Sequence, residues 1–258
     1  MSGASHRPPR TLIVLAHPEP RAFTAAWAGA TAAACRALGQ GVTVSDLYAA
    51  GFDPAERAAH YPGRAGRFDV MAEQDRAAAE GRLPGDVAAE LARIAAADRV
   101  IFHFPLWWFA PPAMLKGWCE RVLVHGVAHA SRRRFDTGPY RGKTALFCVT
   151  TGASAAESGP DGREGDSRLL LWPLAQTLRY CGFAVKRPVL VHGVHGFHRG
   201  AARAALEARL ERVLRDQQAV IAGFEARPAL RFNADAEFDA DGRLRRGAES
   251  VTPFIRHR

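Results

Sequence analysis

The chain has 258 residues, of which 48% are hydrophobic, 24% charged and 9% aromatic. This balance is that of a soluble globular protein, and it excludes disordered, collagen-like and coiled-coil chains. Basic residues number 35 against 26 acidic ones, a formal charge of +9, and only three of the basic residues are lysines. Such an arginine excess fits a nucleic-acid or membrane partner, an anionic small molecule or compositional background, and composition alone does not choose among them.

Targeting and membrane signals are missing from the sequence. The apolar run at 12–16 is shorter than the roughly 7 to 15 residues of a signal-peptide core, and no stretch reaches the ~18 apolar residues of a membrane helix. The four cysteines lie far apart and form no C-x-x-C pair, so neither a zinc knuckle nor a disulfide framework is predicted. We expect a cytoplasmic protein that is not integral to a membrane.

The first third of the chain reads as a βαβ unit. An almost wholly apolar run at 11–16 predicts a central parallel strand, and an alanine-rich helix is expected at 23–38 before a second strand at 42–45. Residues 48–70 carry prolines and glycines without steady periodicity, which is typical of a loop. The further elements expected, in chain order, are helices at 72–79 and 87–97, a strand at 99–104, a helix at 114–124, a strand at 143–150, a helix at 169–180, a strand at 185–191 and a helix at 204–224.

Five strand-like runs alternating with helices predict an α/β fold, an open and doubly wound parallel sheet with helices on both faces. Ligands of such sheets bind at the carboxyl ends of the strands. We expect one domain over residues 1–225. Residues 226–258 are polar and rich in Arg and Asp, so we expect a C-terminal arm that packs on the domain or on a dimer partner.

The segment after the first strand has the composition of an anion site. His17 and Arg21 precede a helix whose first backbone N–H groups are free, and Thr24 lies in its first turn, an arrangement suited to a phosphate or pyrophosphate. Neither G-x-G-x-x-G nor G-x-x-x-x-G-K-S/T occurs, so the ordinary dinucleotide and phosphate loops do not apply. The alternative is that His17 and Thr24 only cap a structural helix.

Three adjacent aromatic residues follow the third strand. Trp107, Trp108 and Phe109 lie on a proline-bounded loop, 105–112, where no helical or strand periodicity can bury them. Aromatic planes stack on flat rings, and the loop amides could bond the edge of a heterocycle. The segment 150–153 offers hydroxyls and small residues to the same pocket. The alternative is an interface or core cluster.

Several motifs together resemble the flavodoxin-like NAD(P)H quinone reductases, the DT-diaphorase family. They are H-P-E-P-x-x-F from His17, F-P-L-x-W-F-x-x-P-A-x-L-K-G-W-x-x-R over 104–121, T-T-G from Thr150, L-W-P from Leu171 and C-G-F from Cys181. The resemblance spans roughly residues 10–225. It implies a flavodoxin-like fold, a homodimer, a bound FAD with FMN as the alternative, and NADPH or NADH as hydride donor.

The resemblance also assigns residues to the site. The flavin pyrophosphate side would be held by His17, Arg21, Ala22, Phe23, Thr24 and Ala26, the isoalloxazine by Pro105, Leu106, Trp107, Trp108 and Phe109, and its other edge by Thr150, Thr151, Gly152 and Ala153. Trp108 and Phe109 would also border the substrate, and His129 would either donate to an acceptor carbonyl or cap a loop. Ser158 and Glu164 stand where the family has a Tyr and a His that relay charge and protons. Neither replacement is equivalent, although Glu164 could exchange a proton and Ser158 could hydrogen-bond.

The activity implied is a flavin-dependent NAD(P)H:quinone oxidoreductase, in which hydride passes from NAD(P)H to the flavin and then to a small aromatic or quinone-like acceptor. The alternatives are reduction of an azo, nitro or polyketide-type substrate and a flavin-binding regulatory subunit of a potassium efflux system. No nucleic-acid-binding motif occurs. The histidines at 192–198 and 125–129 lack further ligands, so no metal is expected. Packing and dimer contacts are the expected roles of Lys116, Gly117, Trp118 and Arg121.

Overall fold

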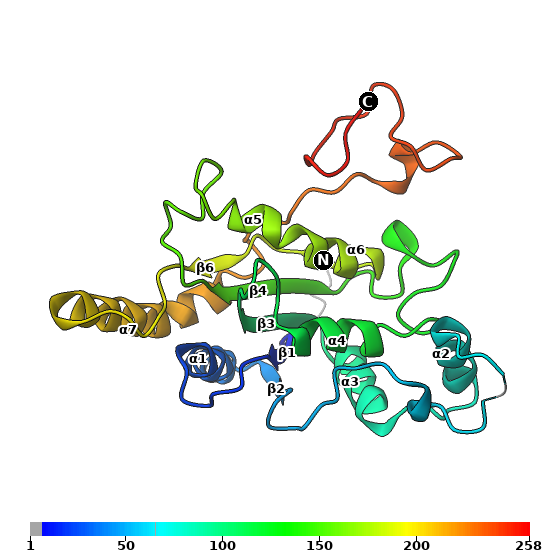
Figure 1. The fold of residues 1–258 in the computed structure, drawn as a ribbon, viewed down its shortest axis with the longest axis horizontal. Helices are drawn as coiled ribbons and strands as arrows, with labels where there is room; N and C mark the ends of the chain where they lie inside the picture. The colour runs from blue at the N-terminus through cyan, green and yellow to red at the C-terminus, as the bar shows by residue number, and fades with distance from the viewer. Residues whose placement is uncertain (1–6, 65) are drawn as a thin grey trace, which may run out of the picture.

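The computed structural model describes residues 7–64 and 66–258 as a twisted sheet flanked by helices (Figure 1). The strands are β1 (Arg10–Leu15), β2 (Gly41–Asp46), β3 (Arg99–Pro105), β4 (Thr144–Thr150), β5 (Ala184–Val185) and β6 (Val189–Val191). The helices are α1 (Phe23–Ala37), α2 (Val70–Ala79), α3 (Gly85–Ala96), α4 (Ala113–Val122), α5 (Ser167–Leu170), α6 (Trp172–Tyr180) and α7 (Gly200–Ala222), with short 3₁₀ turns at Ala58–His60, Phe135–Thr137 and Asp235–Glu237.

All strand pairs of the sheet are parallel, in the order β2-β1-β3-β4-β5, and β6 also pairs with β4. The strand order reverses between β1 and β3, which is the switch point where doubly wound sheets bind ligands. The predicted flavodoxin-like, doubly wound parallel sheet is therefore confirmed.

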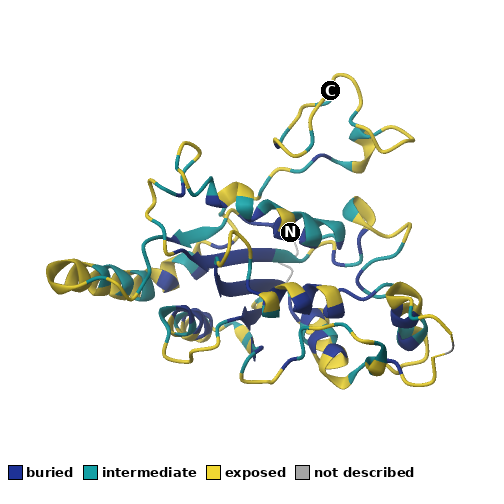
Figure 2. Cartoon of the chain, viewed as in Figure 1, coloured by how far each residue is buried: buried dark blue, intermediate teal, exposed yellow. Residues whose placement is uncertain are grey.

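Helices cover both faces of the sheet, and the strands alternate between two cores. Along β3, Ile101 joins Trp27 of α1 and Phe224, which follows α7, whereas Phe102 joins Trp118 of α4 on the opposite face. Figure 2 shows the central strands as the most buried layer of the molecule, and β1, β3 and β4 are buried along almost their whole length. Strands covered on both faces read as continuous apolar runs, which explains the runs at 11–16 and 143–150.

The single fifth strand expected at 185–191 is wrong, because the structure divides it into β5 and β6. Pro188 has no N–H to donate to a ladder, so a strand cannot continue through it. Between the two pieces, Lys186 pairs with Ala229 and the Arg187 N–H donates to the Pro228 carbonyl at 2.8 Å. The helix expected at 169–180 is likewise divided into α5 and α6, with Pro173 in the first turn of α6.

A buried polar network fixes α1 and α7 to the sheet. The Trp27 indole donates to the Gln217 carbonyl oxygen at 2.8 Å, and the Gln217 amide donates to the Thr31 hydroxyl at 2.8 Å. That hydroxyl lies 3.0 Å from Nε2 of His103 on β3. His103 is fully buried, and burial lowers its pKa to about 3. The imidazole is therefore neutral at physiological pH.

The loop that follows β2 is held against α4 by two residues of the motif at 104–121. A Cβ on Gly117 would lie 2.0 Å from the Pro54 carbonyl oxygen, so only glycine permits this approach. Arg121, which is 1% exposed, donates to the Asp53 carbonyl at 2.6 Å and pairs with Asp86. Both residues have the packing role that the sequence analysis expected of them; the dimer contacts stay a prediction.

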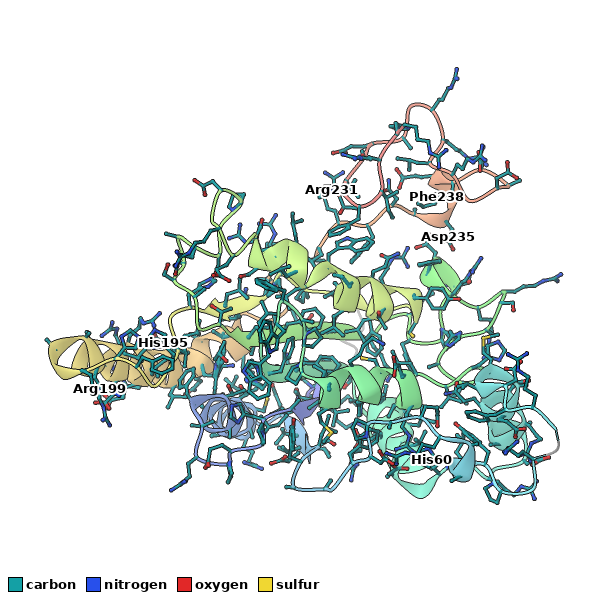
Figure 3. All side chains as sticks on the ribbon, in the orientation of Figure 1. His60, His195, Arg199, Arg231, Asp235 and Phe238 are labelled. Atoms are coloured by element: carbon teal, nitrogen blue, oxygen red, sulfur yellow. The ribbon has the colours of Figure 1, made fainter. Side chains whose placement is uncertain are left out.

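The segment after α7 forms an arm that extends away from the sheet (Figure 1). Its Leu230 N–H donates to the Val185 carbonyl at 2.7 Å, and Phe254 stacks on Trp172 at 4.4 Å between ring centroids. Arg231, Asp235 and Phe238 lie on this arm, far from His195 and Arg199 beside α7 (Figure 3). In the described part of the chain, no helix combines the length and the apolar character needed to span a bilayer.

Candidate active site

The loops that follow β1, β3 and β4 meet at one edge of the sheet. Pro105 and Thr150, the last residues of β3 and β4, are paired in register, and the Leu106 N–H donates to the Thr150 carbonyl at 2.8 Å. The His17 ring contacts the Trp107 ring edge-on at 5.7 Å between centroids. The three segments that carried the sequence motifs are thus neighbours in space.

A cavity of about 280 Å³ lies at this edge. Its lining brings together residues from the loops after β3 and β4 and from the segment before α5. The lining residues are Leu106, Trp108, Phe109, Thr151, Gly152, Ala153, Ser158, Glu164, Ser167 and Leu170. Eight of the residues that the sequence analysis placed in the flavin and relay positions, all of the lining except Ser167 and Leu170, therefore surround one hollow.

The aromatic residues form a strained and exposed turn. Trp107 and Ala110 exchange backbone hydrogen bonds of 3.0 and 3.1 Å, which leaves Trp108 and Phe109 as a two-residue turn with φ of 49° and 62°. Such turns normally take Asn and Gly, and large side chains with positive φ are unfavourable. Trp108 is 93% exposed and Phe109 51%. The core-cluster alternative is therefore wrong, and the rings are available to a ligand or an interface.

Unused backbone donors border the aromatic turn. Within the described residues, the N–H groups of Trp108, Phe109, Gly152 and Ala153 make no hydrogen bond to the protein. A Cβ on Gly152 would meet nothing within 4 Å, so the space beside this segment is open. Stacking faces with donors at their edge are what a planar heterocycle with carbonyl and ring-nitrogen acceptors requires.

The first turn of α1 is not capped by a side chain. Ala22 is the N-cap residue, and the Thr24 hydroxyl instead lies 3.2 Å from the Thr150 hydroxyl in a buried contact. His17 accepts the Glu19 N–H through Nδ1 at 3.0 Å. The alternative that His17 and Thr24 cap the helix is therefore wrong. The N–H groups of Phe23 and Thr24 have no acceptor among the described residues, so the helix start can receive an anion.

Arg21 lies beside this helix start, but its guanidinium pairs with Glu19. Its Nε donates to Glu19 at 2.9 Å, and its side chain is 89% exposed. The Arg21 side chain is the largest cause of the lowered pKa of Glu19. Because exposed ion pairs contribute little free energy, Arg21 can exchange the carboxylate for a phosphate at small cost.

Ser158 and Glu164 occupy a tight loop between β4 and α5. Ser158 is buried, and the Ser167 N–H donates to its carbonyl at 3.1 Å. The Glu164 N–H donates to the Glu157 carbonyl at 3.0 Å, while its carboxylate has no hydrogen bond or ion pair among the described residues. The backbone therefore fixes both residues at the cavity without engaging the Glu164 side chain.

His129 does not line this cavity in its own chain. It lies in a separate, more apolar groove of about 810 Å³, where its ring contacts His125 and Tyr180 edge-on at 5.3 Å. Burial, with a smaller contribution from the His125 charge, lowers the pKa of His129. Phe109 and Leu170 line both the groove and the cavity, so the two hollows adjoin each other.

The sequence analysis missed the support that the loop after β6 gives to the site. The Thr151 hydroxyl donates to the Ala153 carbonyl at 3.0 Å and lies 3.0 Å from Nδ1 of His192. The N–H of Gly193 donates to Ala153 and that of Val194 to Thr151. Burial lowers the pKa of His192, with a smaller contribution from Arg209. The one sequence signal for this contact is the predicted strand that ends at Val191, because the loop after it lies beside the end of β4.

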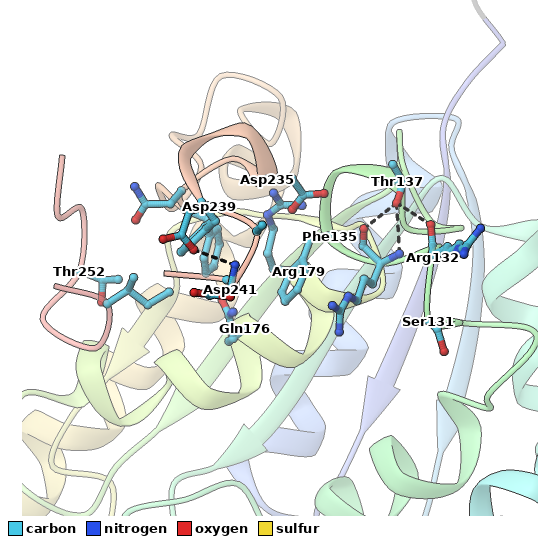
Figure 4. Close-up of a pocket in the computed structure, with 17 residues that line it drawn as sticks. Ser131, Arg132, Phe135, Thr137, Gln176, Arg179, Asp235, Asp239, Asp241 and Thr252 are labelled. Atoms are coloured by element: carbon cyan, nitrogen blue, oxygen red, sulfur yellow. Dashed lines mark hydrogen bonds between the residues drawn. The ribbon is translucent and has the colours of Figure 1, made fainter. Parts of the chain in front are cut away.

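A third cavity, of about 670 Å³, lies between the arm and α6 (Figure 4). Arg132 and Arg179 line one side of it, and Asp235 and Asp241 belong to the arm. It contains none of the residues predicted for the flavin or the acceptor. Among the described residues no group of three or more His, Cys, Asp or Glu side chains is arranged to hold a metal ion.

The chain matches known proteins over most of its length. The family model described as "Flavodoxin-like fold" matches residues 9–215. NAD(P)H dehydrogenase (quinone) 1 of Rattus norvegicus is 42% identical over 189 residues, which cover 72% of this chain and 69% of the relative.

Solved structures give the same result. A candidate quinone reductase from Klebsiella pneumoniae superposes with a TM-score of 0.82 at 28% identity, covering 92% of this chain and 94% of the other. The general stress protein 14 of Treponema denticola, solved in complex with FMN, superposes with a TM-score of 0.57 at 28% identity, covering 83% and 99%.

Proposed function

We propose that this chain, which belongs to the flavodoxin-like family of NAD(P)H dehydrogenases (quinone), passes hydride from NAD(P)H through a bound flavin to a quinone-like acceptor. The observation that carries the proposal is the exposed turn of Trp108 and Phe109 beside unused N–H groups of Gly152 and Ala153. A bound flavin supplies a ring that accepts and returns hydride. The chain supplies the surfaces that hold and orient the reacting rings.

The residues divide into a phosphate side and a ring side. The free N–H groups at the start of α1 and the exposed Arg21 would hold phosphate, since the helix dipole and the guanidinium both favour negative charge there. The turn at 107–110 would stack on the ring, and the N–H groups at 152–153 would bond its edge. FAD is the cofactor we propose, because the motif from His17 resembles the family's FAD-binding members, and FMN is the alternative result.

Ser158 and Glu164 line the same cavity, where they would face the acceptor. Glu164 is positioned to exchange a proton with a bound acceptor, and Ser158 to hydrogen-bond it. His129 could join this site only in a homodimer, because in its own chain it lies in the neighbouring groove. We propose a homodimeric, cytoplasmic enzyme whose catalytic domain spans residues 1–225 and whose extension, 226–258, packs on the domain or on the second copy.

The test is spectroscopic. Purified protein should carry or take up a flavin whose absorbance bleaches with NADH or NADPH under anaerobic conditions and returns when menadione is added. Mass analysis of the released flavin identifies FAD or FMN. Protein that binds neither flavin would refute the proposal. Bound flavin with no turnover across quinones would instead favour a regulatory subunit.

A further inference from the structure

Glu164 is the single ionisable residue among those that line the strand-end cavity. The other walls are apolar, aromatic or neutral and polar, with Leu106, Trp108, Phe109 and Leu170 as the large side chains. No positively charged side chain lines the cavity beside this carboxylate. Its field therefore acts on whatever enters the cavity.

Two of the three other carboxylates of the same loop are engaged, and the third, Asp161, is exposed and does not line the cavity. Glu157 accepts the Ser154 hydroxyl at 2.9 Å and pairs with Arg163 at 2.5 Å, and Asp166 caps α5 by accepting the Arg168 N–H at 2.8 Å. No such partner reaches the Glu164 carboxylate from the described residues.

The backbone leaves Glu164 little freedom to move away. A Cβ on Gly162 would lie 2.2 Å from the Glu157 carbonyl oxygen, so the loop is closely packed just before Glu164. The segment 154–168 has four acidic and two basic residues, a net charge of −2 in a chain of +9. This loop is thus negative although the protein is basic.

We propose that Glu164 selects acceptors that carry a positive charge or an N–H donor beside their aromatic ring, and disfavours anionic ones. This rests on the proposed function, since it names the class of acceptor for the same cavity. Two features act in the same direction. The free carboxylate attracts cations, and the faces of Trp108 and Phe109 attract cations through their ring quadrupoles. An anionic acceptor would meet repulsion and no positive partner among the lining residues.

The expected size follows from Coulomb's law across a half-exposed cavity. One unit charge near another there changes affinity roughly fivefold, so the preference for a cationic over an anionic acceptor should be about 25-fold. The effect should appear in KM more than in kcat, because the charge acts on binding. It should shrink as salt is raised.

Matched naphthoquinones test this directly. Three compounds share one ring and one propyl spacer and end in trimethylammonium, hydroxyl or sulfonate, so that their reduction potentials are alike. In Glu164→Gln the cationic-to-anionic ratio of kcat/KM should fall from about 25 to below about 3. Any loss of proton exchange lowers turnover of all three compounds alike, so the hydroxyl compound serves as the reference and the ratio alone tests the charge preference. Asp161→Asn is the matched control, because Asp161 lies exposed in the same loop and does not line the cavity.

A binding measurement keeps the inference separate from turnover. Redox-inert naphthalenes with the same three tails are titrated against the protein, and quenching of tryptophan fluorescence gives their dissociation constants. The cationic ligand should bind wild type about fivefold more tightly than the neutral one, and Glu164→Gln should abolish that difference. Wild type without a charge preference, or an equal loss in Asp161→Asn, would overturn the inference. Absence of flavin with an intact charge preference would refute the proposed function alone.

Discussion

Replacing Trp108 with glycine tests whether its ring binds the flavin or stabilises the fold. Trp108 is 93% exposed, so its removal loses almost no buried area, and its φ of 49° is a conformation that glycine adopts without strain. Relief of that strain is worth about 1–2 kcal/mol, and the added chain entropy of glycine costs roughly 0.4–1 kcal/mol. The free energy of unfolding should therefore stay level or rise by about 1 kcal/mol.

The affinity for flavin should fall, although the stability does not. Loss of one stacked aromatic plane removes about 0.5–1.5 kcal/mol beyond area burial, a weakening of roughly threefold to tenfold. Trp108→Ala is the matched control, because it removes the same ring but keeps a Cβ at positive φ. It should bind flavin as weakly as the glycine variant and be less stable than it. Urea unfolding and flavin fluorescence titration measure the two quantities. A loss of more than about 2 kcal/mol in both variants, or unchanged flavin affinity, would refute the assignment.

Three further predictions concern the scaffold and the phosphate side. Gly117→Ala should destabilise the protein by about 1–3 kcal/mol in urea unfolding, because its Cβ would meet the Pro54 carbonyl at 2.0 Å; a loss below about 0.5 kcal/mol would mean that the loop adapts. Burial lowers the pKa of His103 to about 3, so between that value and the unfolded value of about 6.5 only the unfolded chain binds the proton and stability falls as pH drops. His103→Gln should remove up to about 1.4 kcal/mol of that loss per pH unit. Urea unfolding near pH 7 and near pH 5 measures it, and an equal fall in the free energy of unfolding for both proteins would contradict the prediction. Arg21→Ala should weaken flavin binding about threefold to tenfold at low salt with unchanged stability, since the side chain is 89% exposed; affinity equal to wild type in a flavin titration would remove Arg21 from the phosphate side.

Much of the fold could be predicted because strands that are buried on both faces have apolar residues at successive positions. The runs that form β1, β3 and β4 are mostly apolar, and their order with the helices predicts a doubly wound sheet. The division of the fifth strand was missed although Pro188 stands in it. The apolar residues at 185–191 predict one continuous strand, but the ladder needs a backbone N–H that Pro188 does not have.

The candidate site was predictable in its position but not in its internal contacts. His17, Trp108 and Thr151 each follow a strand, and ligands of parallel sheets bind at the carboxyl ends of the strands. The sequence therefore predicts a site at one edge of the sheet. The support from His192 and the separate groove of His129 depend on contacts between segments far apart in the sequence. The strain at Trp108 and Phe109 was also invisible, because backbone torsions that contradict residue preference cannot be inferred from residue type.

The most direct test of the central claim is a crystal structure of the protein with its flavin. We predict that the isoalloxazine lies against the turn at 107–110 with its edge at the N–H groups of Gly152 and Ala153, and that its phosphate lies at the start of α1. A flavin found in the cavity between the arm and α6, or in the groove beside His129, would contradict the account.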